Sequence, residues 1–210
     1  MARPSVEVER RQQILQATCE SIATLGFRGV RVADVAKGAG VSSGTVHYYF
    51  ESKDALLHAA FAFNFENSLR RRDWILDAKE SPRAHLHHLV SSYLPSGPET
   101  ITAWRVWVEL WAAALGSAEL QALNDSVYET WRNLVRGTVD AAREEGTLNV
   151  DNDEGDLTDM LLGMLDGLAI QALVGSSHVT RERMLEVCDA FIDSIMVPNA
   201  ELVENANRNM

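Results

Sequence analysis

Residues 40–44, Gly-Val-Ser-Ser-Gly, match the G-x-S-x-G pattern with which a serine hydrolase presents its nucleophile at a sharp turn. The same residues could instead form the tight turn of a helix-turn-helix motif, in which a short helix beginning near Ser42 enters the major groove of DNA. One interpretation predicts an esterase and the other a regulator of genes. The secondary structure on either side of the turn decides between them, because a nucleophile elbow follows a strand and a helix-turn-helix turn follows a helix.

The residues before and after this turn have the spacing of helices. Apolar residues within 14–25 recur at intervals of three and four, which predicts a helix that ends at Gly26. A short helix is expected at about 32–38, and a third at about 42–49. No run of alternating β-branched residues leads into Ser42, and a nucleophile elbow needs a strand at that place. The Ser42 hydroxyl is therefore expected to cap the third helix, and the hydrolase is kept only as an alternative.

The rest of the chain repeats the helical pattern. We expect six further helices, at about 53–77, 82–94, 99–115, 118–145, 156–175 and 180–196. All nine together predict an all-α fold, since no β-α-β alternation is present. Residues 1–52 are expected to form a three-helix, helix-turn-helix domain. Residues 53–198 are expected to form a larger helical domain, and residues 199–210 a frayed tail.

The composition is that of a soluble globular protein, with 46% apolar and 23% charged residues in a chain of 210. No signal peptide or membrane span is visible, and Cys19 and Cys188 fit no redox or metal spacing, so a cytoplasmic location is expected. The net charge of −11 is uneven, because residues 1–72 carry +3 and the remainder −14. This distribution would present one basic end to a polyanion, although an acidic solvated surface explains it equally well.

The helix-turn-helix interpretation assigns a role to most residues between 32 and 50. Small and branched apolar residues would form the core between the helices, and Gly40 can adopt the positive φ of the turn. The outward side of the third helix would carry short or aromatic polar groups that suit phosphates and base edges. These outward residues are Ser43, Gly44, Thr45, His47, Tyr48 and Tyr49.

The segment VRVADVAKGAGVSSGTVHYYFESKDALL, residues 30–57, resembles the N-terminal domain of the TetR family of bacterial transcriptional regulators. D-V-A, A-G-V-S, G-T, Y-F and S-K-D-A-L-L occur in the family's order and without a gap. The resemblance implies about nine helices, of which the first three bind DNA and the others form a ligand-binding and dimerisation domain. It also implies a homodimeric repressor that a small-molecule effector releases from a palindromic operator of double-stranded DNA.

Site residues follow from the same resemblance, position by position. The residues expected to face bases are Ser43, Gly44 and His47. Those expected to hold phosphates are Thr45, Tyr48, Tyr49 and Lys53. The family often has Thr or Ser near position 31 and Tyr at position 47, whereas this chain has Arg31 and His47. Arg31 would either contact a phosphate or stay solvated, and His47 puts any operator borrowed from the family in doubt.

The resemblance extends into the second half of the chain. WRVWVELWAAAL (104–115), ELQALNDSVYETWRNLV (119–135) and DGLAIQAL (166–173) resemble the C-terminal domain of the BetI-type branch, which is named for a choline-responsive repressor. Choline is therefore one candidate effector among several. The last two expected helices are apolar around much of their surface, and in the family they pair with those of a second copy, although an internal core is the alternative. The expected interface residues are Leu161, Leu162, Leu165, Phe191 and Ile195.

A tryptophan-rich stripe, together with Asp166, is the candidate effector pocket. The members of the stripe are Trp104, Trp107, Val108, Trp111 and Leu115, of which the first four are the candidate pocket residues. At about 100° per residue they share one side of the expected helix, where they could surround a flat or cationic ligand. Plain core packing explains the stripe as well. Asp166 is expected to be buried, where its carboxylate would form an ion pair with a cationic ligand or with a group across the dimer.

No catalytic or metal site is predicted, and no cofactor is expected. A ligand-degrading enzyme would need a nucleophile, a base and an acid close together, and the sequence offers no such group. His85, His87 and His88 are spread around one helix and fit solvated residues better than metal ligands. The arginine run 70–72 is expected to be solvated or to aid attraction to DNA, and Glu109 to pair with a nearby arginine, Arg105. A constitutive DNA-binding protein without an effector remains the other alternative.

Overall fold

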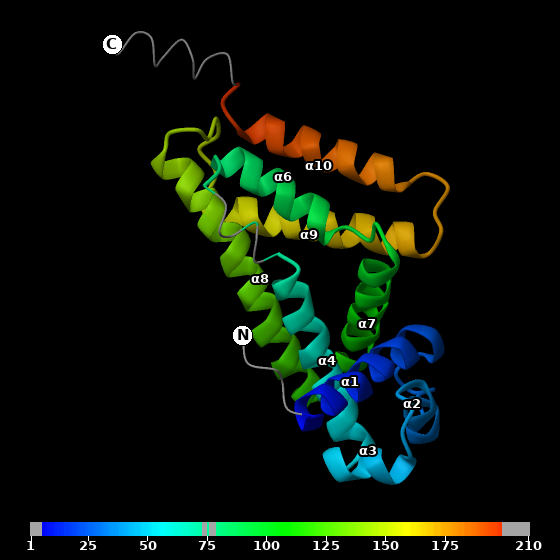
Figure 1. Ribbon diagram of the computed structural model, residues 1–210. Coiled ribbons are helices and arrows are strands. Elements are labelled where there is room, and N and C mark those ends of the chain that lie inside the picture. The colour runs from blue at the N-terminus through cyan, green and yellow to red at the C-terminus, as the bar shows by residue number, and fades with distance from the viewer. Residues whose placement is uncertain (1–5, 73–74, 76–78, 199–210) are drawn as a thin grey trace. The chain divides into compact units, whose positions relative to one another are not determined.

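The computed structural model describes residues 6–72, 75 and 79–198, and within them the chain is mainly helical (Figure 1). The helices are α1 (Val6–Leu25), α2 (Val32–Gly38), α3 (Ser43–Tyr49), α4 (Lys53–Arg70), α6 (Pro82–Tyr93), α7 (Pro98–Ala114), α8 (Ala118–Glu144), α9 (Glu154–Leu173) and α10 (Arg181–Ile195). This confirms the predicted all-α class. The tail at 199–210 lies outside the described residues. Within the described ranges, β pairing is limited to one isolated bridge between Leu148 and Met196.

The turn at residues 40–44 has the geometry of a helix start and not that of a nucleophile elbow. Ser42 precedes α3, and its Oγ accepts a hydrogen bond from the Thr45 N–H at 3.0 Å, as the sequence predicts for an N-cap. The element before the turn is the helix α2, and Gly40 has a φ of +65°. The strand that an elbow requires is replaced by this helix, so the interpretation of residues 40–44 as a nucleophile elbow is wrong.

The fourth helix is shorter than predicted. α4 ends at Arg70, with Arg71 at its C-cap, whereas the sequence pattern predicts helix as far as about residue 77. The next side chain, Arg72, is 2% exposed and its guanidinium is packed among aromatic rings, which are described below. Residues 73–74 and 76–78 lie outside the described residues.

The described chain consists of two compact units, each with its own hydrophobic core. The first unit contains residues up to 71 together with 97–127, which are α1 to α4, α7 and the start of α8. The second contains 72–96 and 128 onward, which are α6, the remainder of α8, α9 and α10. None of the described helices combines the length and the apolar character that a bilayer crossing requires.

In the first unit, α1 packs against α2, α4 and α7. Ile14 and Ile22 from α1, Phe61 from α4 and Leu110 from α7 are at most 1% exposed. Burial of each such side chain contributes about 1.5–3 kcal/mol. The three N-terminal helices therefore share one core with α4 and α7, and a functional boundary at residue 52 stays a prediction.

In the second unit, α10 packs against both α6 and α9. Leu86 from α6, Leu161 from α9 and Ile192 from α10 meet in its core. Asp153 caps α9 by accepting hydrogen bonds from the first backbone N–H groups of that helix. The Arg143 guanidinium holds the loop before α9, because its Nη1 donates to the Val150 carbonyl oxygen at 2.7 Å and its Nη2 to that of Asn152 at 2.5 Å.

Candidate nucleic-acid interface and effector site

Four exposed residues form one side of α3, which we call the α3 face: Ser43, Gly44, His47 and Tyr48. At about 100° per residue they span an arc of about 140°. Val46 lies on the other side and is 1% exposed, whereas Tyr48 is 76% exposed. The α3 face thus presents a hydroxyl, an imidazole and a phenol, which can exchange hydrogen bonds with phosphates and base edges.

Thr45 and Tyr49 follow the α3 face beyond Tyr48, by about 60° and 100° around the helix, and are partly buried. The Thr45 hydroxyl is 2.9 Å from Ser42 Oγ, and the ring of Tyr49 meets Tyr48 edge-on at 5.1 Å. These contacts hold the two residues in defined orientations at the edge of the face. Such fixed polar groups suit phosphate contacts, which set the position of a protein on DNA.

Two cations flank the helix-turn-helix. Arg31 is exposed at the start of α2. Lys53 begins α4, and its Nζ donates a hydrogen bond to the Arg28 carbonyl oxygen at 3.4 Å. Because an ammonium group has three donors, this contact leaves the Lys53 side chain able to contact a phosphate as well.

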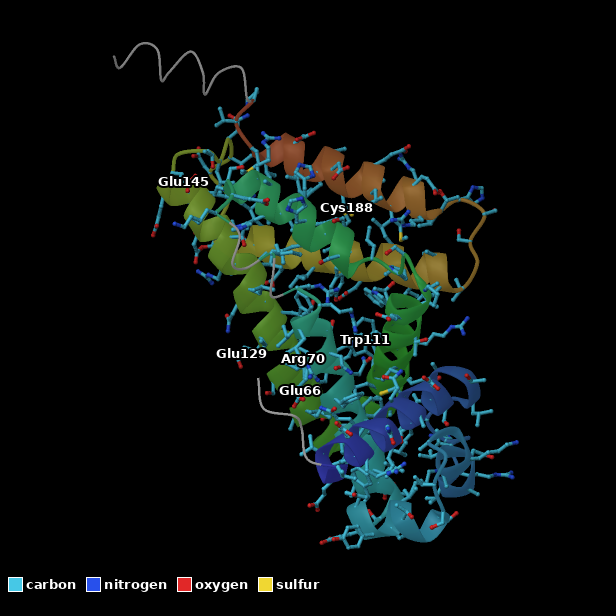
Figure 2. The ribbon with its side chains drawn as sticks, viewed as in Figure 1. Glu66, Arg70, Trp111, Glu129, Glu145 and Cys188 are labelled. Atoms are coloured by element: carbon cyan, nitrogen blue, oxygen red, sulfur yellow. The ribbon has the colours of Figure 1, made fainter. Side chains whose placement is uncertain are left out.

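The structure places the members of the tryptophan stripe in different surroundings. Trp104 and Trp107 are 3% and 8% exposed, and Trp107 packs edge-on against Phe65 at 6.2 Å. Trp111, on α7 (Figure 2), is partly buried and meets the Trp104 ring edge-on at 6.0 Å. Val108 is also partly buried, whereas Leu115, at the C-cap of α7, is 87% exposed, so its inclusion in the stripe is wrong. Trp107 thus has the contacts of a core residue, while Trp104 and Trp111 form a ring pair in the first unit.

Glu109 has a backbone partner in place of the predicted Arg105. Its Oε2 accepts a hydrogen bond from the Phe27 N–H at 2.7 Å, across 82 positions of sequence. Helical spacing could not have indicated this partner, since it concerns only neighbours within one helix.

Asp166, in the second unit, accepts hydrogen bonds from two tyrosines. The Tyr93 hydroxyl donates to Oδ1 at 2.8 Å, and the Tyr128 hydroxyl donates to Oδ2 at 3.4 Å. Burial raises the pKa of Asp166 to about 6, although the two hydrogen bonds oppose this change. Burial likewise raises the pKa of Tyr93 well above its usual value and that of Tyr128 to about 12. Both hydroxyls therefore stay protonated donors at neutral pH.

The guanidinium of Arg72 lies against the aromatic rings of the same cluster. Its central carbon is 4.7 Å from the centre of the Trp131 ring and 5.8 Å from that of Tyr93. Its Nε donates to Ser92 Oγ at 2.9 Å, and its Nη2 donates to the Ser92 carbonyl oxygen at 2.6 Å. Aromatic rings around a cation are the means by which proteins bind quaternary ammonium groups. We call Tyr93, Tyr128, Trp131 and Asp166 the aromatic cage, and Arg72 is the cation within it.

Of the cage, the sequence predicted Asp166 alone. Tyr128 and Trp131 are three residues apart on α8, so helical spacing could have placed them on one side. Arg72 was expected to be solvated or to attract DNA, and its burial corrects that interpretation. No sequence pattern indicates that Tyr93 belongs to the cage, because its partner Asp166 is 73 positions away.

The expected dimer residues are mostly covered within their own chain. Leu161, Leu162, Leu165 and Ile195 are 1–5% exposed in the core of the second unit, and Phe191 is partly buried. This core explains their apolar character without a partner, as in the alternative considered from the sequence. Their role in a dimer therefore stays a prediction.

A different set of α9 residues faces outward at spacings of three and four. These residues, which we call the α9 outer row, are Met160, Gly163, Gly167, Gln171 and Val174. Met160 is 52% exposed and Val174 73% exposed. The residues between them are small or polar, so this side of α9 is open to solvent in the single chain.

Two family models match different parts of this chain. Residues 14–60 match the family described as bacterial regulatory proteins of the tetR family. Residues 82–197 match the family described as BetI-type transcriptional repressor, C-terminal.

Similar proteins are also described as transcriptional regulators. The transcriptional regulator PksA of Bacillus subtilis is 29% identical over 90% of this chain and 91% of that protein. A regulator named BetI from Stenotrophomonas maltophilia is 36% identical over 59% of this chain and 63% of that protein. The crystal structure of a transcriptional regulator from Saccharomonospora viridis in complex with choline has a TM-score of 0.85 and 28% identity, and covers 91% of this chain and all of that one.

Proposed function

Since this chain belongs to the TetR family of bacterial transcriptional regulators, with a C-terminal domain of the BetI type, we propose that its homodimer represses genes at a palindromic operator and is released by a small cation. The family assigns it to the DNA-binding regulators with a ligand-binding C-terminal domain. The family does not identify the residues that contact DNA or ligand, the form of the operator or the effector, and these are the assignments that we propose. The observation that carries the DNA assignment is the α3 face, whose polar groups are exposed while Val46 anchors the opposite side.

We assign base contacts to the α3 face and phosphate contacts to the residues that border it. The bordering residues are Arg31, Thr45, Tyr49 and Lys53. Tyr48 could serve either purpose because of its high exposure. The test is to select bound DNA from a random pool with the purified protein. A palindromic consensus with half-sites about one helical turn, roughly 34–36 Å, apart is expected, and a pool without enrichment would contradict the assignment.

We assign the dimer contact to the α9 outer row. Its residues are exposed in the single chain, and its small members would allow a second helix to approach closely. Two-fold symmetry would then present two α3 faces to successive turns of the duplex.

We assign the effector to the aromatic cage and its chemistry to a quaternary ammonium or similar cation. Two aromatic rings already surround a cation there, and Asp166 supplies a negative charge beside them. The choline complex of the Saccharomonospora viridis relative supports this class of ligand. The effector would take the position that the Arg72 guanidinium holds in the free protein.

Displacement of Arg72 suggests how the effector reaches the DNA-binding helices. Arg72 follows the C-cap of α4, and Lys53 begins the same helix. An effector that expels the guanidinium would free the end of α4 from its anchor at Ser92. If this state binds DNA less well, the effector lowers operator affinity by linkage.

Choline added to the protein–operator complex tests the effector assignment. We expect choline to release the wild-type protein, and Trp131→Leu to weaken this response strongly because a cation–π contact is lost. Trp111→Leu is the matched control, since it removes a tryptophan of the α7 stripe and leaves the aromatic cage intact. It should keep the response to choline. A response lost in Trp111→Leu and kept in Trp131→Leu would move the effector to the stripe.

One observation favours the second candidate function, a regulator without an effector. The cage is filled by a side chain of the same protein, which is also what a purely structural cluster would do. Wild-type protein that binds its operator but binds no quaternary ammonium compound would favour this alternative.

A further inference from the structure

A groove of about 670 Å³ lies in the first unit among α1, α4 and α7. Its lining contains none of the residues assigned above to DNA, to the effector or to the dimer contact. Three amide side chains line it, from Gln16, Asn64 and Asn67, together with Arg70 and Arg71. Arg70, on α4, can be seen in Figure 2.

Arg71 differs from the other polar residues of the groove because its Nε is buried without a hydrogen-bond partner. The neighbouring groups are paired: Arg70 Nη2 donates to Asn67 Oδ1 at 2.7 Å, and Asn64 Nδ2 donates to a carbonyl oxygen of α7 at 3.2 Å. Gln16 Nε2 donates to Glu20 Oε1 at 3.0 Å. A buried donor without an acceptor is costly, and in native proteins it calls for an explanation. An acceptor that enters the groove would provide one if the guanidinium turns toward it, since Nε is covered in the free protein.

The charges around Arg71 restrict which acceptor fits. Two arginines, Arg70 and Arg71, line the groove with two acids, Glu20 and Glu99. Glu99 acts on Arg71 through space, but the two form no ion pair within 4 Å among the described residues. The acids disfavour an anion of high charge such as phosphate, whereas a single carboxylate matches the fork of one guanidinium.

The remaining wall is apolar and can hold the rest of an organic ligand. Phe63 contributes a partly buried ring, and Pro98 and Ala103 contribute the facing side from α7. A polar end and an apolar wall in one concave site are typical of small-molecule sites. A short aliphatic acid has the matching distribution of groups.

We propose that this groove binds a small organic monocarboxylate, whose oxygens accept hydrogen bonds from the Arg71 guanidinium and whose apolar part packs against Phe63 and Pro98. The site goes beyond the cationic effector proposed above and uses none of its residues. Because α1 and α4 form two of its walls, an occupied groove would also change operator affinity if it favoured one state of these helices.

Hexanoate and its neutral counterpart hexanamide provide the test on the full-length protein, by isothermal titration calorimetry. We expect hexanoate to bind and hexanamide and inorganic phosphate to bind much more weakly. Arg71→Gln should lower hexanoate affinity at least about tenfold, because a charge-assisted hydrogen bond is lost. The matched control is Arg136→Gln, which removes a cation of α8 that faces Asp140 and should leave the affinity unchanged.

Protein stability distinguishes a binding arginine from a structural one. Arg71 Nε has no hydrogen-bond partner to lose, and Glu99 lies beyond ion-pair distance, so Arg71→Gln should keep or raise the melting temperature. The Nε–H resonance of Arg71 in the wild type gives a second measurement, which does not depend on the variant, and it should shift on addition of hexanoate. No hexanoate binding, equal binding of hexanamide or phosphate, or an unmoved Arg71 signal would each overturn the proposal. Operator binding and choline response, measured on the same samples, test the proposed function separately.

Discussion

The Phe27 N–H donates a hydrogen bond of 2.7 Å to Glu109 Oε2, which ties the turn after α1 to α7. Gly26, just before it, has a φ of +73°, and a Cβ there would lie 3.4 Å from the same carboxylate. Glycine thus serves both the backbone conformation and the close approach of Glu109. The carboxylate holds the loop that leads from the first helix toward the helix-turn-helix.

Glu109→Ala should lower the free energy of unfolding by about 1.5–3 kcal/mol, because it removes the charged acceptor of a backbone N–H. Urea unfolding followed by circular dichroism measures the change. Glu109→Gln keeps an acceptor and should lose less. Equal stability of all three proteins would mean that water replaces the carboxylate without cost.

Ser42→Ala should lower the free energy of unfolding by about 1 kcal/mol, because the N-cap of α3 is lost. Ser42→Asp is the matched control, since an aspartate caps the helix equally well. The two variants are compared with the wild type by thermal unfolding. Ser42→Asp as unstable as Ser42→Ala would speak against the cap.

Lys53→Ala should weaken binding to all DNA sequences similarly and reduce the salt dependence of binding by about one unit, because one phosphate contact is lost. Fluorescence anisotropy over a series of salt concentrations measures both effects. Lys79→Ala removes an exposed lysine outside the helix-turn-helix and should change neither. A steep salt dependence retained in Lys53→Ala would remove Lys53 from the interface.

His47→Ala should relax discrimination at one base pair in each half-site while affecting non-specific binding little, because His47 lies on the exposed α3 face. Competition among operators with single substitutions provides the measurement. Uniform weakening across all sequences would instead assign His47 to a phosphate.

Gly167→Lys should convert the dimer into a folded monomer. In the single chain a side chain at this position would meet nothing within 4 Å, and the loss of a helical glycine stabilises by about 1 kcal/mol. Gly137→Lys on α8 has the same open surroundings and should stay dimeric. Sedimentation velocity separates the two forms, and a dimeric Gly167→Lys would place the interface elsewhere.

Asp166→Asn should stabilise the free protein near neutral pH. Burial raises the folded pKa of Asp166 to about 6, above its ordinary value of 3.8, so the folded state binds more protons than the unfolded state between these values. The wild type therefore loses stability as pH rises through this window, by at most about 3 kcal/mol, whereas the asparagine variant does not.

Unfolding of the wild type and of Asp166→Asn at about pH 4 and pH 7.5 tests the direction of this pH dependence of stability. The advantage of Asp166→Asn should appear at the higher pH and shrink at the lower one. A constant difference between the two proteins would mean that Asp166 does not titrate in this range.

The helices of the DNA-binding part could be predicted from the sequence because their signals are local. Ser42 caps α3 by accepting from the N–H of Thr45, three residues ahead, and Gly26 and Gly40 adopt positive φ within their own turns. The exposed side of α3 follows from the spacing of its residues alone. Each of these features depends on neighbours within one turn of helix.

The end of α4 and the partners of the charged residues required the tertiary structure. Apolar spacing predicts where a helix can continue, but the burial of Arg72 concerns rings on α6 and α8. Glu109 and Asp166 likewise find partners that are far away in sequence. Periodicity contains no information about such contacts.

The sequence by itself thus determined an all-α transcriptional regulator whose third helix exposes polar side chains. Only the tertiary structure decided that Arg72 fills an aromatic cage beside Asp166 and that the Nε of Arg71, one residue earlier, is buried without a hydrogen-bond partner. The physical reason is that helical pattern depends on backbone hydrogen bonds between near neighbours. The environment of a charge depends instead on whatever side chains the folded chain brings within a few ångströms of it.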